Sequence, residues 1–443
     1  MKKQLACVLA VLLLLTALSG CAEKTLLDPK EPITLTMWHV YGEQADSPMN
    51  RLVEEFNRTV GKEQGVIINV TLMSSTAQIG EKLLDAQANT PGVPAMPDLF
   101  FCHNNNAEEL GAENLLDWNT IFSEDALSSY IPEFLADGMV GESLCVFPIS
   151  KSTHLLFVAG GQFDRFAADT GVTYDDLATW DGFFDVAAKY YDWSGGKPFC
   201  ALDYLIRAVE LNAMEQGSSA LYTADGWYDF ENSALRDSWM EFADSYAQGH
   251  IIVSDLYSNT QVMTGEVVAG LGSTASILYY NDTVTYPDNT SEPMDLRVLP
   301  MPKATGSELL VTQAGVGLCA TKSTEQKAEA AALFASWLTE PARNLDFCVG
   351  SGYMPVTQEA FAQIQDYTFA SEAYQRLYTT LNTVNQTATA VREPSFGGYY
   401  AKIYTLYDTL RELQKAIPTR LSDGADSQSI AAETWDIFQA LDR

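Results

Sequence analysis

The segment GEVVAGLGSTASI, residues 265–277, has the residue types and spacing of a phosphate-binding loop. Gly270, Gly272 and Ala275 form a G-x-G-x-x-A pattern after an apolar run, which is typical of dinucleotide-binding enzymes. In such enzymes the loop opens a full helix, and an acidic residue follows about 20 residues later. Here the glycines lie past the middle of the chain, and the turn-rich stretch YYNDTVTYPDN follows them. The sequence therefore disfavours a nucleotide site.

Other patterns of catalytic residues are also weak. The chain contains no G-x-S-x-G, and its four histidines, His39, His103, His154 and His250, show no metal-binding spacing. A glycosidase needs two carboxylates that face one cleft, but among 58 Asp and Glu residues some pair always looks plausible. We therefore expect no catalytic residues, no metal and no cofactor. A secreted enzyme that acts on glycosides is the alternative class.

The hydrophobic pattern predicts the elements that position polar residues. Residues 33–38, ITLTMW, alternate apolar residues with threonine, which predicts a strand. Apolar residues at i, i+3, i+4 and i+7 predict a helix over 49–56. The remaining predictions are strands at 66–72, PDLFF and GKPFCALDY, and helices near 77–89, after Thr179, from the capping-box pair Ser323 and Gln326 to Pro341, and over 400–416 and 428–441. This alternation predicts an α/β fold with mostly parallel sheets, and the length predicts two domains.

The N-terminus predicts the compartment. Two lysines precede an apolar run from Leu5 to Leu15, and the box LSGC ends at Cys21. This order resembles a bacterial lipoprotein signal. A transmembrane anchor is the alternative, but the run is shorter than the roughly 20 residues that span a bilayer. We expect residues 1–20 to be removed, Cys21 to be lipidated, and residues 21–32 to tether the body to the extracellular face of a Gram-positive-type cell membrane.

Charge and cysteine content narrow the possible partners. Without residues 1–20 the chain has 24 basic and 58 acidic residues, a balance that argues against nucleic acid and against direct adhesion to anionic lipid. The five cysteines of the body, at 102, 145, 200, 319 and 348, are odd in number and form no C-x-x-C pair. Buried free thiols are therefore the default expectation.

Eight motifs occur in the order expected of extracellular solute-binding proteins of ABC importers, the carbohydrate-type family 1. They are ITLTMWHVYGEQADSPMNRLVEEFN, MPDLFFCHNNNAEELGAENLLDW, CVFPISKSTHLLFV, TWDGFFDVAAKY, MTGEVVAGLGSTAS, RVLPMPKATG, GVGLCATKSTEQKAEAAALFASWLTEP and SGYMPVT. The resemblance covers residues 33–357. It implies a two-lobed periplasmic-binding-protein-like (type II) fold, in which hinge segments cross between the lobes and the ligand is held in the cleft.

The resemblance also implies a role for the glycine-rich segment. The equivalent segment in the family is a strand that runs from one lobe to the cleft, with small residues that let the backbone approach the ligand. Ser273, Thr274 and Ser276 would offer hydroxyls there. We prefer this interpretation to a nucleotide site.

A sugar-binding cleft needs aromatic rings and short polar side chains, because a sugar presents apolar faces and a rim of hydroxyls. Candidates lie where predicted strands end: Trp38, His39 and Tyr41 follow the first strand, Asn104 the third, and Tyr204 the strand GKPFCALDY. The alternative for each aromatic residue is core packing. His39 beside Trp38 is equally compatible with a structural role.

Within the family, WHVYGE, PISKSTHLL, MTGEVVAGLGSTASI and GYMPVT look like the subgroup that binds glycerol 3-phosphate and related phosphodiesters. This likeness implies ligand-binding roles for Ser152, Thr153, Ser273, Gly315 and Tyr353, and a phosphate-binding role for Arg392. Two departures stand against it: CHNNNAE replaces the subgroup's glutamate, and VTLMSST lacks its tyrosine. A neutral sugar or oligosaccharide is therefore the first choice, and glycerol 3-phosphate or a glycerophosphodiester is the alternative.

The resemblance further implies the lobe boundaries and the partners. We expect residues 33–147 with 298–340 to form one lobe, and residues 148–297 with 341–443 to form the other. The expected partners are a small-molecule solute and the ABC permease subunits with their ATPase. The lipid provides the only contact with the membrane, no nucleic acid is bound, and the protein is a monomer.

Overall fold

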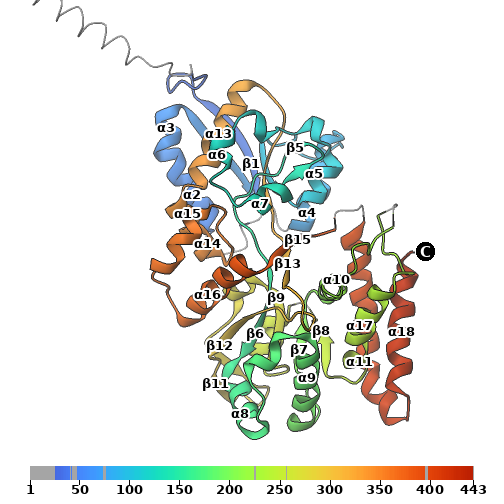
Figure 1. Cartoon of the computed structure of the whole chain (residues 1–443). Coiled ribbons are helices and arrows are strands. Elements are labelled where there is room, and N and C mark those ends of the chain that lie inside the picture. The colour runs from blue at the N-terminus through green and yellow to red at the C-terminus, as the bar shows by residue number, and fades with distance from the viewer. Residues whose placement is uncertain are drawn as a thin grey trace, which may run out of the picture.

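The computed structural model describes residues 25–442, apart from residues 40, 42–46, 73–75, 224–225, 256 and 395–397. The expected signal peptide and the expected lipid site at Cys21 lie outside the described residues. In the described part, no helix is both long enough and apolar enough to cross a membrane. Two lobes, each built on its own sheet, lie one above the other in Figure 1, which confirms the predicted two-lobed α/β fold.

The first lobe contains a four-stranded sheet in the order β14-β3-β1-β2. Its strands are β1 (Ile33–His39), β2 (Val66–Leu72), β3 (Leu99–Cys102) and β14 (Gly317–Ala320). β1 is parallel to β2 and β3, and β14 is antiparallel to β3. In β1 Leu35 and Met37 are buried while Thr34 and Thr36 are exposed, so the alternation in the sequence marks the two faces of the sheet.

The helices of the first lobe are α2 (Pro48–Arg58), α3 (Val60–Gln64), α4 (Thr76–Gln87), α5 (Asn104–Leu110), α6 (Glu124–Leu127), α7 (Pro132–Asp137) and α13 (Glu325–Leu338), and a hairpin joins β4 (Met139–Val140) to β5 (Ser143–Leu144). Three of these helices, α2, α4 and α13, match predicted helices, and the four others were not predicted. The ring of Phe56 in α2 packs 5.0 Å from that of Phe334 in α13, centroid to centroid. The capping residue of α13 is Thr324, which accepts from the N–H of Lys327, so the predicted capping box at Ser323 and Gln326 is wrong by one residue.

The second lobe contains a five-stranded sheet in the order β12-β6-β9-β7-β8. Its strands are β6 (His154–Ala159), β7 (Cys200–Leu202), β8 (Ile251–Val253), β9 (Ala269–Ser273) and β12 (Leu296–Pro300), and β10 (Thr283–Thr285) pairs with β11 (Ser291–Pro293) in a hairpin. All six residues of β6 are buried, because β6 lies inside the sheet between β9 and β12. β7 runs parallel to β8 and β9, and β6 runs antiparallel to β9.

The helices of the second lobe are α8 (Gly160–Thr170), α9 (Trp180–Ser194), α10 (Leu205–Glu215), α11 (Ser233–Ala247) and α12 (Ser258–Met263). The helix predicted after Thr179 is confirmed as α9, whose N-terminal N–H of Gly182 donates to the Thr179 side chain. Trp180 and Phe183 are buried on its inner face as predicted, whereas Phe184 is only partly buried.

The glycine-rich segment is a strand and not the start of a nucleotide-binding helix. β9 is followed by a short 3₁₀ helix, η4 (Thr274–Tyr279), and no α-helix begins there. A Cβ atom on Gly272 would lie 2.9 Å from Ser276 Oγ and 3.0 Å from Asp203 Oδ2. Glycine is required at this position because these side chains pack directly on the backbone.

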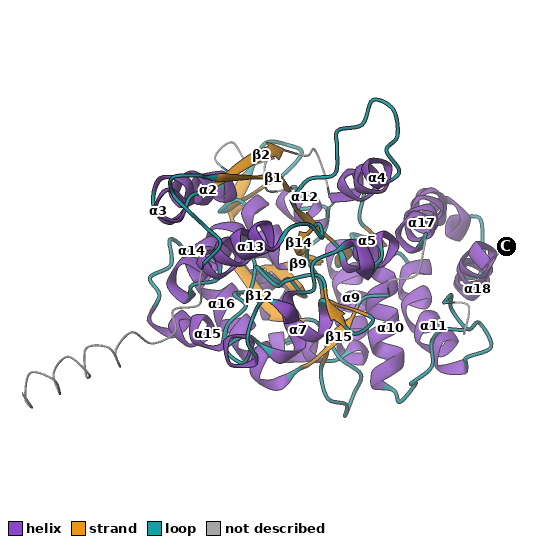
Figure 2. Cartoon of the chain, turned by 90° about the horizontal axis from the view of Figure 1, so that it is seen from above, coloured by secondary structure: helices purple, strands orange, loops and turns teal. Residues whose placement is uncertain are grey.

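The C-terminal part of the chain adds five helices: α14 (Pro341–Ser351), α15 (Gln358–Gln363), α16 (Glu372–Thr387), α17 (Tyr399–Ser422) and α18 (Ser427–Gln439). α17 and α18 stand with α11 at one side of the second lobe, as both views show (Figures 1 and 2). Stacking of Trp239 on Phe438, 4.5 Å between ring centroids, joins α11 to α18. The helix predicted at 400–416 continues through Pro418 to Ser422.

Three segments that are distant in the sequence meet between the lobes. β13 (Leu310–Gln313) pairs in parallel with β15 (Thr389–Arg392), and both strands lie between the two sheets in Figure 1. Ser152 pairs with Ala314 in an isolated bridge, which brings the third segment alongside. The lobe boundaries expected at 147, 297 and 340 remain predictions, and residue 297 lies within β12.

Candidate functional site

A small cavity lies where residues of the first lobe meet the segments that link the lobes. The first lobe contributes the residues from the end of β3 and from α7, and the linking segments contribute the rest: His103, Asn104, Asn105 and Asp137, then Gln313, Ala314, Gly315, Arg392, Glu393, Pro394 and Tyr400. The cavity volume is about 20 Å³, which is room for a water molecule but not for a sugar. A larger solute therefore enters only when the lobes separate.

The structure brings three predicted site residues, Asn104, Gly315 and Arg392, to this cavity. Asn104 begins α5 directly after β3, so the carboxyl end of a parallel strand points to the cavity, as is usual for ligand sites in α/β folds. Its amide nitrogen donates to the carbonyl of Asp137 at 2.7 Å, whereas its buried Oδ1 atom has no hydrogen-bond partner within the described part of the chain.

The charged groups around the cavity are arranged in pairs. Lys151, which is buried, donates to the Asp137 carboxylate at 2.5 Å. Arg392 donates to Glu108 at 2.7 Å, and its Nε atom lies 3.6 Å from Asp137. A phosphate at Arg392 would have to compete with two carboxylates, so the geometry disfavours the phosphate-binding role predicted for this arginine.

A second group of predicted residues meets at the upper ends of β6, β7 and β9. The hydroxyl of Ser152 lies 2.9 Å from that of Thr274, and the N–H of Thr274 donates to the carbonyl of Thr153 at 3.0 Å. The ring of His154 stacks on that of Tyr204 with centroids 3.8 Å apart. Ser273 pairs with His154 across the ladder between β9 and β6.

A buried carboxylate lies beside this group. Asp203 accepts from the N–H of Ser258 at 2.7 Å and from its hydroxyl at 3.0 Å, and burial raises the pKa of Asp203 to about 6. Ser276, a predicted site residue, lies over Gly272 next to the same carboxylate. The end of β9 is therefore rich in hydroxyls, but many of them already bond to one another.

Three tyrosines near these groups, Tyr257, Tyr400 and Tyr404, were not predicted as site residues, whereas Tyr204 was. Burial raises the pKa of Tyr204, Tyr400 and Tyr404, and the nearby Glu393 raises it further in each. Tyr257 lies near Tyr204 and Tyr404. The side chains of Tyr257 and Tyr404 are each 57% exposed, whereas most large hydrophobic side chains of the described residues are buried or partly buried. Tyr257 follows the end of β8, so the rule that selected aromatic residues at strand ends applies to it. Because the strand β8 was not predicted, Tyr257 was not selected.

Four further predicted site residues belong neither to the cavity lining nor to the group at the ends of β6, β7 and β9. Trp38 is packed in an apolar cluster with Phe100, and both ring nitrogens of His39 are occupied, by Asn50 and by the N–H of Tyr41. Tyr41 donates to or accepts from Ser150 at 3.2 Å, and its ring meets that of Tyr353 edge-on at 6.2 Å. Burial of this kind favours core packing for Trp38 and His39, and their role in ligand binding stays a prediction.

The two histidines nearest the site are held in the neutral form. Burial and the neighbouring Lys151 lower the pKa of His103 to about 4. Burial, with a smaller contribution from Arg207, lowers the pKa of His154 to about 3. The described residues contain no group of three or more metal-binding side chains.

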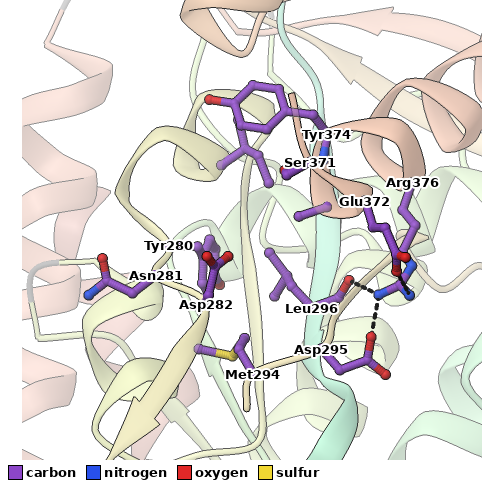
Figure 3. A pocket seen from close by; sticks show the side chains of 12 residues that line it. Tyr280, Asn281, Asp282, Met294, Asp295, Leu296, Ser371, Glu372, Tyr374 and Arg376 are labelled. Carbon is purple, nitrogen blue, oxygen red and sulfur yellow. Dashed lines mark hydrogen bonds and ion pairs between the residues drawn. The ribbon is translucent and has the colours of Figure 1, made fainter. Parts of the chain in front are cut away.

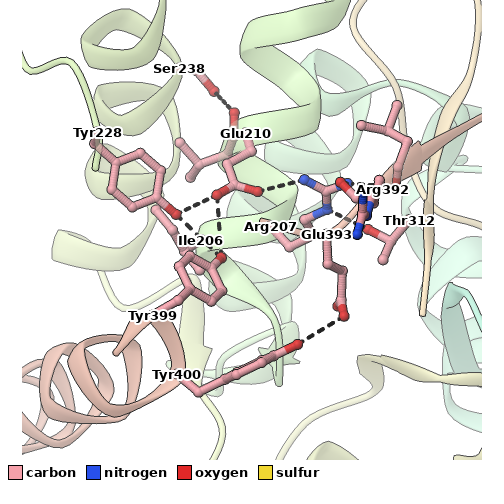
Figure 4. Close-up of polar contacts among 12 residues, drawn as sticks. Ile206, Arg207, Glu210, Tyr228, Ser238, Thr312, Arg392, Glu393, Tyr399 and Tyr400 are labelled. Atoms are coloured by element: carbon pink, nitrogen blue, oxygen red, sulfur yellow. Dashed lines mark hydrogen bonds and ion pairs between the residues drawn. The ribbon is translucent and has the colours of Figure 1, made fainter. Parts of the chain in front are cut away.

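A buried ionic network fixes the linking strands to the second lobe. Arg207 of α10 donates to Glu210 at 2.7 Å, to the hydroxyl of Thr312 at 2.7 Å, and to the carbonyls of Val391 and Arg392 at 2.8 and 2.9 Å. Figure 4 shows Glu210 between this guanidinium and the hydroxyls of two tyrosines. The network therefore sets the position of β15, which carries Arg392 to the cavity.

A larger cavity, about 270 Å³, lies within the second lobe beside α16 (Figure 3). Arg376 crosses its rim and pairs with Asp295 at 2.6 Å and with Glu372 at 2.9 Å. Three of its charged groups thus bond to one another, and none of the predicted site residues lines it. A cavity confined to one lobe cannot couple ligand binding to movement between lobes, so we take the smaller cavity between the lobes as the candidate site.

Comparison with known proteins shows the family of the chain. The family model described as bacterial extracellular solute-binding protein matches residues 51–375. No curated protein sequence matches the chain.

Solved structures with the same fold cover nearly the whole chain. The cyclic alpha-maltosyl-1,6-maltose binding protein from Arthrobacter globiformis is 15% identical, with a TM-score of 0.67 over 93% of this chain and 99% of that one. An extracellular solute-binding protein family 1 member from Alicyclobacillus acidocaldarius is 16% identical, with a TM-score of 0.67 over 94% and 100%. UgpB from Mycobacterium tuberculosis, in complex with glycerophosphocholine, is 16% identical, with a TM-score of 0.63 over 92% and 98%.

Proposed function

Because the chain belongs to the family of bacterial extracellular solute-binding proteins, we propose that it captures a sugar or an oligosaccharide outside the cell and delivers it to an ABC permease. Membership of the family implies a small-molecule solute, an extracellular location and a permease partner. The observation that carries the sugar proposal is the group of tyrosines near the candidate site: Tyr400 lines the cavity, and Tyr204, Tyr257 and Tyr404 lie close by. Aromatic rings stack on the apolar faces of sugars, and the nearby hydroxyls match the sugar rim.

The phosphate alternative has less support. Arg392, the cation that would hold a phosphate, is paired with Glu108 and approaches Asp137. A glycerol phosphate or glycerophosphodiester would displace these carboxylates before it gained the charge-assisted bonds that it needs. We therefore keep glycerol phosphates as the second candidate class and test them beside the sugars.

In the proposed mechanism, the solute is a bridge between lobes. The open form admits the solute; contacts that exist only when both lobes are near then shift the population toward the closed form. Asn104 and Gly315 would contact the solute on the first-lobe side, and Tyr204, Ser273 and Ser276 on the second-lobe side. The protein acts as a monomer and catalyses no reaction in this proposal; its family and structural neighbours are binding proteins.

Thermal unfolding with a panel of sugars and glycerol phosphates tests the proposed ligand. A solute that binds only the folded state should raise the free energy of unfolding by about 2.7 kcal/mol when its concentration is a hundredfold above its dissociation constant. We expect a neutral sugar to raise the melting temperature. Tyr404→Ala should weaken the binding of that sugar by about 1–2 kcal/mol, because a stacking ring is lost. Tyr404→Phe keeps the ring and is the matched control. A shift given by glycerol phosphates alone, and abolished in Arg392→Ala, would replace the sugar proposal.

The lipid anchor is a separate part of the proposal. If Cys21 is acylated, Cys21→Ala should release the protein into the medium, because burying acyl chains supplies about 0.8 kcal/mol per methylene. Fractionation and immunoblotting measure the release, and ligand affinity of the released protein should equal that of the anchored form. A Cys21→Ala protein that stays with the membrane would show that the attachment has another origin.

A further inference from the structure

The charges at the candidate site do not balance. Each of its three cations has its own carboxylate: Lys151 has Asp137, Arg207 has Glu210, and Arg392 has Glu108. Glu393 also lines the cavity and forms no ion pair with any residue that the structure describes. The neutral His103 and His154 supply no positive charge. Glu393 is therefore a carboxylate without a paired cation in the described part of the chain, and so is the buried Asp203 near the end of β9.

The surroundings of Glu393 make its charge costly without a counter-charge. Among the described residues its carboxylate has one hydrogen-bond partner, the hydroxyl of Tyr400 at 3.0 Å, and its other oxygen has none (Figure 4). Burial raises the pKa of Glu393, and the nearby Asp137 and Glu210 raise it further, although Arg207 and Tyr400 oppose this. A partly buried carboxylate of this kind is stabilised when a cation reaches it.

Two acceptor atoms of the cavity have no donor among the described residues. Besides the free oxygen of Glu393, the buried Oδ1 atom of Asn104 has no donor, and the bond from its amide nitrogen to Asp137 fixes which atom is the oxygen. An ammonium group carries three donors and no acceptor, so it matches this set, whereas a phosphate carries only acceptors. The faces of nearby tyrosine rings also attract cations.

We propose that the captured solute carries a protonated amine, and that Glu393 binds this amine with the help of Asn104 and the ring of Tyr400. This inference rests on the proposed function, because it places the amine on the solute that enters between the lobes. An amino sugar would satisfy both the tyrosines and Glu393, because its ring can stack on a tyrosine and its ammonium group can pair with the carboxylate.

Calorimetry on the whole protein with three trisaccharides tests the inference: the trimer of glucosamine, its fully N-acetylated counterpart and the trimer of glucose. The first two differ chiefly in charge. We expect the glucosamine trimer to bind at least tenfold more tightly than either neutral trimer.

The variant Glu393→Gln keeps the shape of the side chain and removes its charge. We expect it to erase the preference for the glucosamine trimer and to leave the neutral trimers within about twofold. Glu372→Gln, an exposed carboxylate on α16, removes the same charge away from the site and should keep the preference.

Each result decides between the two proposals. Equal or tighter binding of a neutral trimer overturns the amine inference and leaves the sugar proposal standing. Tight binding of the glucosamine trimer that survives Glu393→Gln overturns the role of Glu393. Failure of all three trimers to bind overturns both proposals. The preference of the unmodified protein is informative even if Glu393→Gln fails to fold.

Discussion

Replacing Arg207 by alanine should lower the free energy of unfolding by about 3–5 kcal/mol, because it leaves a buried carboxylate without its partner. The side chains of Arg207 and Glu210 are 3% and 0% exposed. Arg207 also donates to Thr312 and to the carbonyls of Val391 and Arg392, so its loss leaves buried acceptors of the linking strands unpaired. Urea unfolding of the variant beside the unmodified protein measures the change.

A double variant separates the ion pair from the packing. Arg207→Met with Glu210→Leu replaces both charges by apolar side chains of similar volume, which often costs little or even stabilises a protein. We expect the double variant to be more stable than Arg207→Ala alone. A loss below 1 kcal/mol in Arg207→Ala, or a double variant less stable than either single one, would contradict the buried network. Solute affinity should also fall in Arg207→Ala, because β15 positions Arg392 and Glu393.

Local patterns in the sequence were sufficient to predict the α/β class, whereas the two lobes were implied by the family resemblance and the second sheet is half antiparallel rather than mostly parallel. Two patterns depend only on which face of an element meets the core: the alternation at Leu35 and Met37, and the helical spacing of Met49, Val53 and Phe56. The structure confirms both patterns. The cap of α13 was misplaced by one residue because Ser323 and Thr324 are both good capping residues, and sequence alone does not show which one has the required backbone geometry.

The site could be predicted only in part, because it depends on contacts between distant segments. Asn104 lies at the cavity since it follows a parallel strand, which is a local rule. The same rule selected Trp38 and His39, but their side chains turn into the core and bond there. Lys151 meets Asp137 because the third linking segment crosses beneath α7, and no spacing in the sequence shows that.

The charge of Arg392 shows the same limit. The resemblance to phosphate-binding proteins assigned Arg392 to an anion site. The sequence shows this cation, but it does not show which side chains surround it in the fold. The structure places Glu108, 284 residues away in the chain, at 2.7 Å from its guanidinium. The local net charge, rather than the residue type, decides which ligand the site can accept.

Stability of the second lobe should depend on pH through His154. This histidine has an ordinary pKa of about 6.5 when unfolded, and burial lowers it to about 3 in the fold. Between these values the unfolded chain binds a proton that the folded chain does not, so the stability present above pH 6.5 is lost as the pH falls toward 3. From pH 7 to pH 4 the loss amounts to about 3 kcal/mol.

Other groups titrate in the same range, so the test compares variants at each pH. His154→Phe keeps an aromatic ring against Tyr204 and cannot bind a proton. We expect the unmodified protein to lose about 3 kcal/mol relative to His154→Phe between pH 7 and pH 4, as measured by urea unfolding. His250→Phe, at a more exposed histidine beside Tyr191, should change the pH dependence less. Parallel curves for the unmodified protein and His154→Phe would mean that burial beside Tyr204 does not hold His154 neutral in the folded protein.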